Sequence, residues 1–283
     1  MKSALNSAMK GKKINEINLF REMAKLFNGS RSKCTYVEEV HGRRGIIEFS
    51  SCFLPGNKKV EISDLLLLTF DKNTEQLRIC FLQAKYRQGK VNEIFNFNAN
   101  IFQWELLLTK PDIISTNFPR QILNFRNDYA SITAYGILYH DDNDRIDFLY
   151  TIPRCIRPSR KIITPIEKHK SIRAFRLKEK CIMPNCFYTG CIRRNETIST
   201  GTLDMFESQV LNCRIGAPII FNPHITSYII NLLNVMKRRA SEPFVIDELL
   251  EYIQKNYENS NEEVTIKYSP AALIVITDSS EIE

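Results

Sequence analysis

Two short apolar segments joined by a polar turn, at residues 58–86, are the feature that most constrains how this chain can fold. The segments read KKVEISDLLLLTF and LRICFLQAKY, and DKNTEQ lies between them. Short apolar runs bounded by polar turn residues are typical of strands buried in a mixed sheet. The sequence therefore predicts a β-hairpin with strands at residues 58–70 and 77–86.

Three polar residues interrupt the apolar background of this hairpin, namely Asp64, Gln83 and Lys85. Side chains alternate along a strand, so Gln83 and Lys85 share one face. A two-residue turn at Asn73 and Thr74 would place Asp64 directly opposite Gln83, with Lys85 on the diagonal. Buried charges need partners, and a bound cation with a phosphate would satisfy all three groups. The alternative is a buried Asp–Lys pair that staples the hairpin.

This arrangement resembles the core of the PD-(D/E)xK nuclease superfamily in its QxK variant. The resemblance covers about the first 110 residues, with Asp64 as the acidic residue and Gln83 and Lys85 as the Gln-x-Lys pair. The chain departs from the pattern at two places. Ser63 precedes Asp64 where a proline is usual, and Gln83 is neutral where the usual residue is acidic. An amide is a weaker ligand for a hard cation than a carboxylate, which bears on metal affinity.

A helix is predicted at residues 14–27, with Asn28 and Gly29 as its stop signal. Glu16 projects into the apolar face of this helix. In many nucleases of the superfamily the first helix supplies an acidic ligand, so the resemblance gives Glu16 that role. Alternatively, Glu16 favours the positive helix N-terminus. Glu61 is set aside as a ligand, because its odd offset from Asp64 places it on the opposite strand face unless a bulge intervenes.

Further elements follow along the chain. We predict a loop at 92–98, a helix at 102–108 that ends near Lys110, a hairpin at 131–139 and 146–152, helices at 225–236 and 244–257, and a last strand at 271–277 on a sheet edge. Gln103 lies on the first of these helices. Gln103 is either a surface residue or a residue of the site, where it would contact the metal ligands or a phosphate.

Charge is distributed unevenly. The whole chain carries +7, whereas residues 154–194 contain twelve Lys or Arg against two acids, and residues 241–283 contain ten acids against two lysines. Basic segments with interleaved aromatic residues suit a phosphate backbone. We therefore predict nucleic-acid contacts from Arg173, Arg176, Arg193 and Arg194. The alternative is a solvated basic face.

Composition is that of a globular protein, with 43% hydrophobic and 25% charged residues. Residues 1–13 lack the apolar core of a signal peptide, and no run of about 18 apolar residues is present to span a membrane. We expect a cytoplasmic protein without a membrane partner. We divide it into a nuclease-like core at 1–152 and a basic, partly helical region at 153–283.

These observations predict an α/β fold, a restriction endonuclease-like mixed sheet flanked by helices with a basic α+β C-terminal part. The resemblance implies metal-dependent hydrolysis of DNA, with Mg²⁺ or Mn²⁺ held by Asp64, Glu16 and Gln83, and with Lys85 orienting the attacking water. Family association suggests bacterial defence against phage. The expected partners are double-stranded DNA, and a second copy of the chain or a partner defence protein. The alternative function is a catalytically silent nucleic-acid-binding protein on the same fold.

Overall fold

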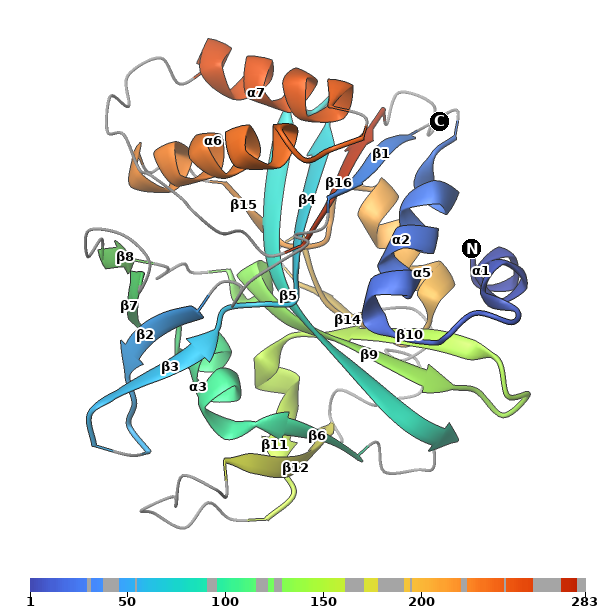
Figure 1. Cartoon of the computed structure of the whole chain (residues 1–283), viewed down its shortest axis with the longest axis vertical. Coiled ribbons are helices and arrows are strands. Elements are labelled where there is room, and N and C mark those ends of the chain that lie inside the picture. Colours follow the sequence, from blue (N-terminus) through green and yellow to red (C-terminus); the bar gives the residue numbers. More distant parts are fainter. Residues whose placement is uncertain are drawn as a thin grey trace.

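A mixed β-sheet with helices on both faces organises the chain in the computed structural model (Figure 1). The structure describes residues 1–29, 32–37, 46–53, 55–90, 96–115, 122–124, 129–160, 171–177, 191–193, 195–219, 223–241, 243–256 and 271–278. Within these residues, nine strands form the main sheet, which contains both parallel and antiparallel pairs. In spatial order they are β1 (Ser32–Val37), β16 (Ala271–Thr277), β4 (Leu65–Asp71), β5 (Gln76–Lys90), β9 (Thr133–His140), β10 (Ile146–Thr151), β14 (Glu196–Thr200) and β13 (Cys191–Arg193), with β15 (Ala217–Pro218) beside β5.

Two smaller antiparallel sheets accompany the main one. The first has the order β11 (Ile156–Pro158), β12 (Ile172–Leu177) and β6 (Asn96–Asn100). The second has the order β3 (Asn57–Glu61), β2 (Ile46–Ser50), β7 (Asp112–Ser115) and β8 (Ile122–Asn124). The chain enters the β4–β5 hairpin from β3 of the second sheet, and β6 of the first sheet follows the hairpin in the sequence.

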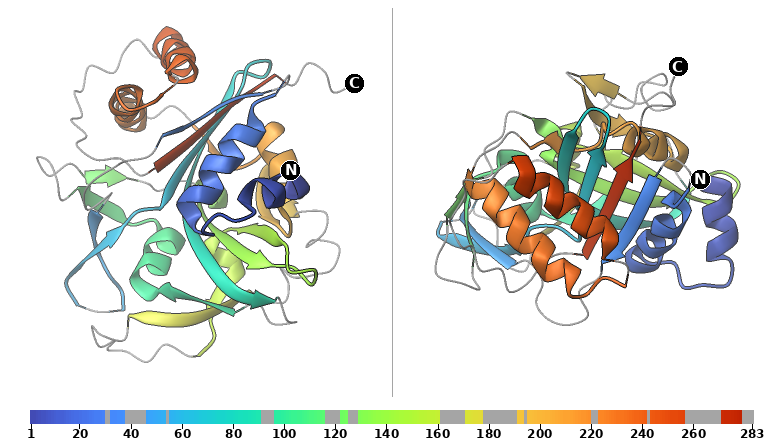
Figure 2. Two further views of the ribbon diagram at one scale, coloured as in Figure 1. Left: turned by 45° about the vertical axis from the view of Figure 1, so that its right-hand side comes forward. Right: turned by 90° about the horizontal axis from the view of Figure 1, so that it is seen from above.

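Helices cover the two faces of the main sheet because its strands bury side chains on both sides (Figure 2). On one face, Leu65, Leu67 and Leu82 pack with α1 (Lys2–Met9), α2 (Glu16–Phe27) and α5 (Leu203–Leu211). On the other face, Leu66 and Phe81 pack with α3 (Ile101–Thr109), α6 (Pro223–Lys237) and α7 (Phe244–Asn256). Two single-turn 3-10 helices, η1 (Ala130–Ile132) and η2 (Pro153–Cys155), complete the described elements. The predicted α/β class, with a mixed sheet flanked by helices, is confirmed.

The central hairpin has the predicted register. Strand β4 pairs antiparallel with β5 from Leu65 opposite Leu82 to Asp71 opposite Gln76. Its first strand, however, is shorter than predicted. Residues 57–61 form β3 in the second small sheet, and the chain bends at residues 62–64 before β4 begins. The apolar pattern alone did not reveal this bend, because both pieces have strand-like composition.

Most other predicted elements are found, and two predictions were wrong. Helices α2, α3, α6 and α7 and the β9–β10 hairpin occur within a few residues of their expected bounds. Of the predicted loop at 92–98, residues 92–95 lie outside the described residues, and residues 96–98 belong to strand β6 (Asn96–Asn100). Strand β16 has the predicted bounds, but it lies inside the sheet, between β1 and β4, and not at an edge. The chain beyond residue 152 thus supplies β14 and β16 to the same sheet as β4 and β5.

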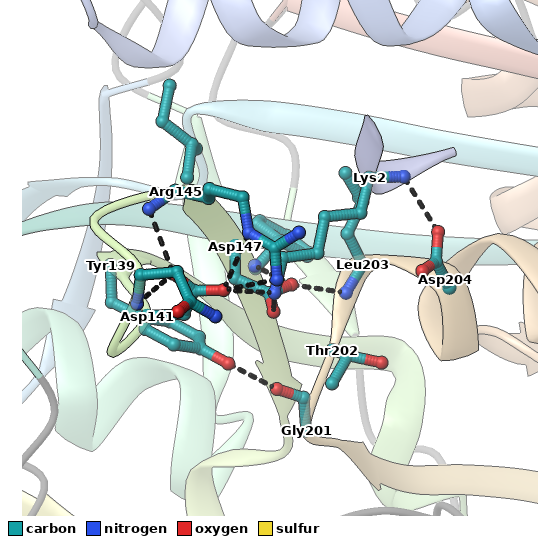
Figure 3. Close-up of polar contacts among 12 residues, drawn as sticks. Lys2, Tyr139, Asp141, Arg145, Asp147, Gly201, Thr202, Leu203 and Asp204 are labelled. Carbon is teal, nitrogen blue, oxygen red and sulfur yellow. Dashed lines mark hydrogen bonds and ion pairs between the residues drawn. The ribbon is translucent and has the colours of Figure 1, made fainter. Parts of the chain in front are cut away.

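Lys2 ties helix α1 to strand β10 (Figure 3). Lys2 Nζ contacts Asp141 Oδ2 at 2.9 Å and also donates to Asp147 Oδ2. Asp147 is buried, and its Oδ1 accepts from the backbone N–H of Leu203 at 2.7 Å. One carboxylate therefore ties β10, α1 and the start of α5 together. Among the described residues, no helix is both long enough and apolar enough to cross a bilayer.

Candidate functional site

Asp64, Gln83 and Lys85 converge as the sequence predicted. Asp64 lies at the bend that precedes β4, and its backbone N–H donates to the Leu82 carbonyl at 3.2 Å. Gln83 and Lys85 lie on β5, where alternation places both on one face of the strand. Lys85 Nζ lies 3.8 Å from Asp64 Oδ2. The Asp64 side chain is 30% exposed and that of Lys85 22%, so the charged atoms meet where the site opens to solvent.

The Asp64 carboxylate is held by β5 itself. Gln83 Nε2 donates to Asp64 Oδ2, and the Ala84 backbone N–H donates to the same oxygen at 2.9 Å. In this arrangement the Gln83 nitrogen, and not its oxygen, faces Asp64. Gln83 is buried, so this contact is shielded from water. Two donors and a nearby ammonium therefore fix the position of this one carboxylate.

Helix α3 brings a fourth side chain to the same place. Gln103 Nε2 donates to Gln83 Oε1 and, at 3.1 Å, to the Glu61 carbonyl. Gln103 is buried, on the helical face that packs towards the sheet. The helix is fixed at its start by Asn100, whose side chain accepts from the Phe102 N–H at 2.9 Å. Of the two interpretations left open by the sequence, the structure therefore places Gln103 at the site.

We call Asp64, Gln83, Lys85 and Gln103 the hairpin site. A continuous hydrogen-bond chain runs through it from the Glu61 carbonyl to Gln103, to Gln83 and to Asp64. Buried polar networks in which the members are satisfied hold their side chains in one conformation. The hairpin site is therefore preorganised around Asp64 without a ligand.

Glu61 lies closer to the hairpin site than the sequence argument allowed. The argument that it points away assumed one continuous strand from Glu61 to Asp64. The chain instead bends at residues 62–64, between β3 and β4, so strand alternation does not carry across this interval. The Glu61 backbone contacts Gln103. The alternation argument that set Glu61 aside therefore does not apply across this bend.

Tyr135 is a neighbour of the hairpin site that the sequence gave no signal for. It lies on β9 directly beside Gln83 in the parallel β5–β9 pair. Its hydroxyl is buried and has no hydrogen-bond partner in the described part of the chain. Burial raises the pKa of Tyr135, and the negative charge of Asp64 raises that pKa further. The hydroxyl therefore stays protonated, as a potential donor towards the site.

The structure describes the other predicted site residues to different extents. Glu16 is the first residue of α2, and its side chain lies outside the described part of the structure. Arg176 is half-buried on β12. The backbones of Arg173 and Arg193 belong to β12 and β13, but their side chains are outside the described part, as is Arg194 entirely. The roles assigned to these residues remain predictions.

The hairpin site offers oxygen ligands, which are the kind that a hard divalent cation prefers. Its oxygen donors are the Asp64 carboxylate and neighbouring backbone carbonyls, whereas the Gln83 amide oxygen accepts from Gln103 and does not face Asp64. Mg²⁺ is commonly held by only one or two carboxylates together with water and substrate phosphates. Within the residues that the structure describes, no group of three His, Cys, Asp or Glu side chains is placed to hold a metal. Glu16, and Glu61 beside the bend, are candidates for a second carboxylate.

Comparison with known proteins adds no further constraint. A scan of protein-family models, a search of curated proteins and a search of solved structures each found no match to this chain.

Proposed function

We propose that this protein is a metal-dependent nuclease that hydrolyses DNA phosphodiester bonds at the hairpin site. The observation that carries the proposal is the contact of Asp64 with Gln83 and Lys85 across the β4–β5 hairpin. This is the arrangement that the resemblance to restriction endonuclease-like nucleases requires. The mixed sheet with helices on both faces is compatible with that fold.

Each residue of the hairpin site has its own role in the proposed reaction. A divalent cation held by Asp64 would supply charge neutralisation and lower the pKa of an attacking water. Gln83, the Ala84 N–H and Gln103 keep the Asp64 carboxylate in one orientation. Lys85, 3.8 Å from Asp64 Oδ2, lies where its ammonium group can orient the water and offset the charge that develops on the phosphate oxygens.

Cleavage of supercoiled plasmid and linear duplex DNA tests the proposal, with Mg²⁺, with Mn²⁺ and with chelator. Asp64→Asn and Lys85→Met should each lower metal-dependent cleavage by about 100-fold or more. Asp142→Asn and Lys33→Met make the same charge changes at exposed positions and should cut normally. An Asp64→Asn protein that cuts at the wild-type rate would overturn the assignment.

The second metal carboxylate can be identified by titration. If Glu16 supplies it, Glu16→Gln should raise the Mg²⁺ concentration needed for half-maximal cleavage, whereas Glu61→Gln should not. The reverse result would move the ligand to Glu61, which the bend before β4 brings near the hairpin site. An unchanged titration in both variants would show that neither carboxylate binds the metal.

A catalytically silent nucleic-acid-binding protein is the second candidate. Two observations favour it. The Gln83 nitrogen, and not its oxygen, faces Asp64, and the described residues contain no cluster of three potential metal ligands. This candidate predicts salt-dependent DNA binding by the wild type, with no cleavage in any divalent metal.

A further inference from the structure

The small sheet β11–β12–β6 has one buried face and one open face. Phe175 and Leu177 on β12 are buried in the core. Residues between them on the strand must point the other way, and Arg176 is the residue between them. In register with Arg176 are Arg157 on β11 and Asn96 on β6. The open face therefore carries a row of three polar side chains, one from each strand.

Arg157 and Arg176 are directly opposite each other in an antiparallel pair. Side chains in such a pair have Cβ atoms about 5 Å apart, and like charges placed there are destabilising. Both side chains are half-buried. Among the described residues, the Arg176 Nε atom is buried and has no hydrogen-bond partner. An anion bound here would accept from the Arg176 Nε and offset the two adjacent positive charges.

The surroundings favour an anion over a solvated face. Strands β6, β11 and β12 read NFNAN, IRP and IRAFRL, so these three strands contain no acidic residue. Asn96 and Asn98 are exposed on the same face and add amide donors beside the arginines. Arginine presents a planar fork of donors that matches phosphate oxygens in pairs. We call Arg157, Arg176, Asn96 and Asn98 the arginine face.

The arginine face is connected to the hairpin site through one rigid element. Strand β6 ends at Asn100, which caps α3, and α3 carries Gln103 to Gln83. The strand and the helix contact each other, and β6, β11 and β12 lie together at the lower end of the molecule (Figure 1). A polyanion on the arginine face would thus be held at a fixed orientation to Asp64 and Lys85.

We propose that the arginine face is a docking site for the phosphodiester backbone of a nucleic acid. The choice of nucleic acid as the source of the phosphates rests on the proposed function. Arg157 and Arg176 clamp the same backbone segment, and the asparagines add hydrogen bonds to neighbouring phosphate or sugar oxygens. Such contacts position a substrate without reading its sequence.

Binding to a short blunt DNA duplex in chelator, where no metal-dependent cleavage occurs, tests the proposal over a series of salt concentrations. Each phosphate contact contributes about −0.9 to the slope of log affinity against log salt. Arg157→Gln and Arg176→Gln should therefore each flatten the slope by about 0.9 and weaken binding about eightfold at 0.1 M salt. The control is Arg238→Gln, which removes the same charge from an exposed position in the turn directly after α6 and should leave the slope unchanged. Equal slopes in all four proteins would overturn the proposal.

Thermal unfolding in low salt without phosphate gives a second, ligand-free test. If the buried Arg176 Nε lacks a partner in the empty protein, Arg176→Gln should unfold at the same temperature as the wild type or higher. A lower midpoint would show that Arg176 is satisfied internally, which would also overturn the proposal. Single-stranded DNA and RNA of the same length then identify which backbone binds most tightly.

Cleavage separates this inference from the proposed function. If the arginine variants flatten the salt-dependence slope but the wild type cuts no DNA in any metal, the arginine face is supported as a docking site and the nuclease proposal fails. If the wild type cuts DNA and the double variant Arg157→Gln/Arg176→Gln cuts equally well at limiting DNA, the nuclease proposal is supported and the arginine face is not a docking site.

Discussion

Replacing Gln103 by Leu tests the hydrogen-bond chain that fixes the hairpin site. Leucine keeps an apolar stem of similar size and removes both donated bonds, to Gln83 Oε1 and to the Glu61 carbonyl. Gln83 is 2% exposed, so its oxygen would be left without water or protein as a partner. A buried acceptor stranded in this way costs about 1–3 kcal/mol. The half-buried Glu61 carbonyl lies nearer to solvent, and the cost should stay near the middle of that range.

Two measurements follow from that magnitude. A loss of about 2 kcal/mol in unfolding free energy should lower the thermal midpoint by about 4–8 °C in a domain of this size. Cleavage, measured well below both midpoints, should fall by about 10- to 100-fold, which is the usual effect of removing a residue that orients a metal ligand. The fall should appear in the turnover rate, because Asp64 loses its fixed orientation while the DNA-binding surface is untouched.

Thr109→Val is the matched control on the same helix. It removes one hydrogen bond, from Thr109 Oγ1 to the Glu105 carbonyl, at the end of α3 away from Gln83. It should cost stability without a loss of cleavage beyond about twofold. A Gln103→Leu protein with wild-type cleavage and an unchanged midpoint would refute the reasoning, since the chain from Glu61 to Asp64 would then hold nothing in place.

Three further substitutions test the surrounding structure by urea or thermal unfolding. Tyr135→Phe removes a buried hydroxyl without a partner among the described residues, so it should stabilise the protein by about 1 kcal/mol; a loss of stability would contradict this. Gly136→Ala would place a Cβ 2.4 Å from Phe148 Cζ, and such overpacking should cost about 1–3 kcal/mol; an unchanged midpoint would show that the ring moves freely. Lys2→Met leaves the buried Asp147 carboxylate without its cation and should cost about 3 kcal/mol. A cost below about 0.5 kcal/mol there would be typical of a surface pair.

Local sequence determined the core of the hairpin site. The polar turn and the alternating apolar residues on either side permit one register, and a slip by one residue would turn every buried leucine of β4 to the other face of its strand. This is why Asp64 could be placed opposite Gln83 from the sequence, and the observed pairing of Leu65 with Leu82 confirms that register. Local signals, namely helix caps and the periodicity of apolar residues, likewise predicted the bounds of α2 and α3 to within a few residues.

Only the tertiary structure decided what surrounds that core. Gln103 reaches Gln83 because α3 packs on the face of the sheet that carries the hairpin site, whereas the sequence left open whether Gln103 lies at the surface or at the site. Tyr135 and Arg157 became neighbours of Gln83 and Arg176 through strand pairs that close over long stretches of chain.

Strand β16 shows the physical reason. Its seven residues were identified correctly as a strand from their apolar composition, yet they lie between β1 and β4. A strand's own sequence makes it form an extended, apolar ribbon. Its neighbours are selected by the burial that the whole sheet gains, a free energy summed over residues far apart in the chain. The sequence of this protein therefore determined its local elements and one pairing register, and packing decided which side chains meet around Asp64.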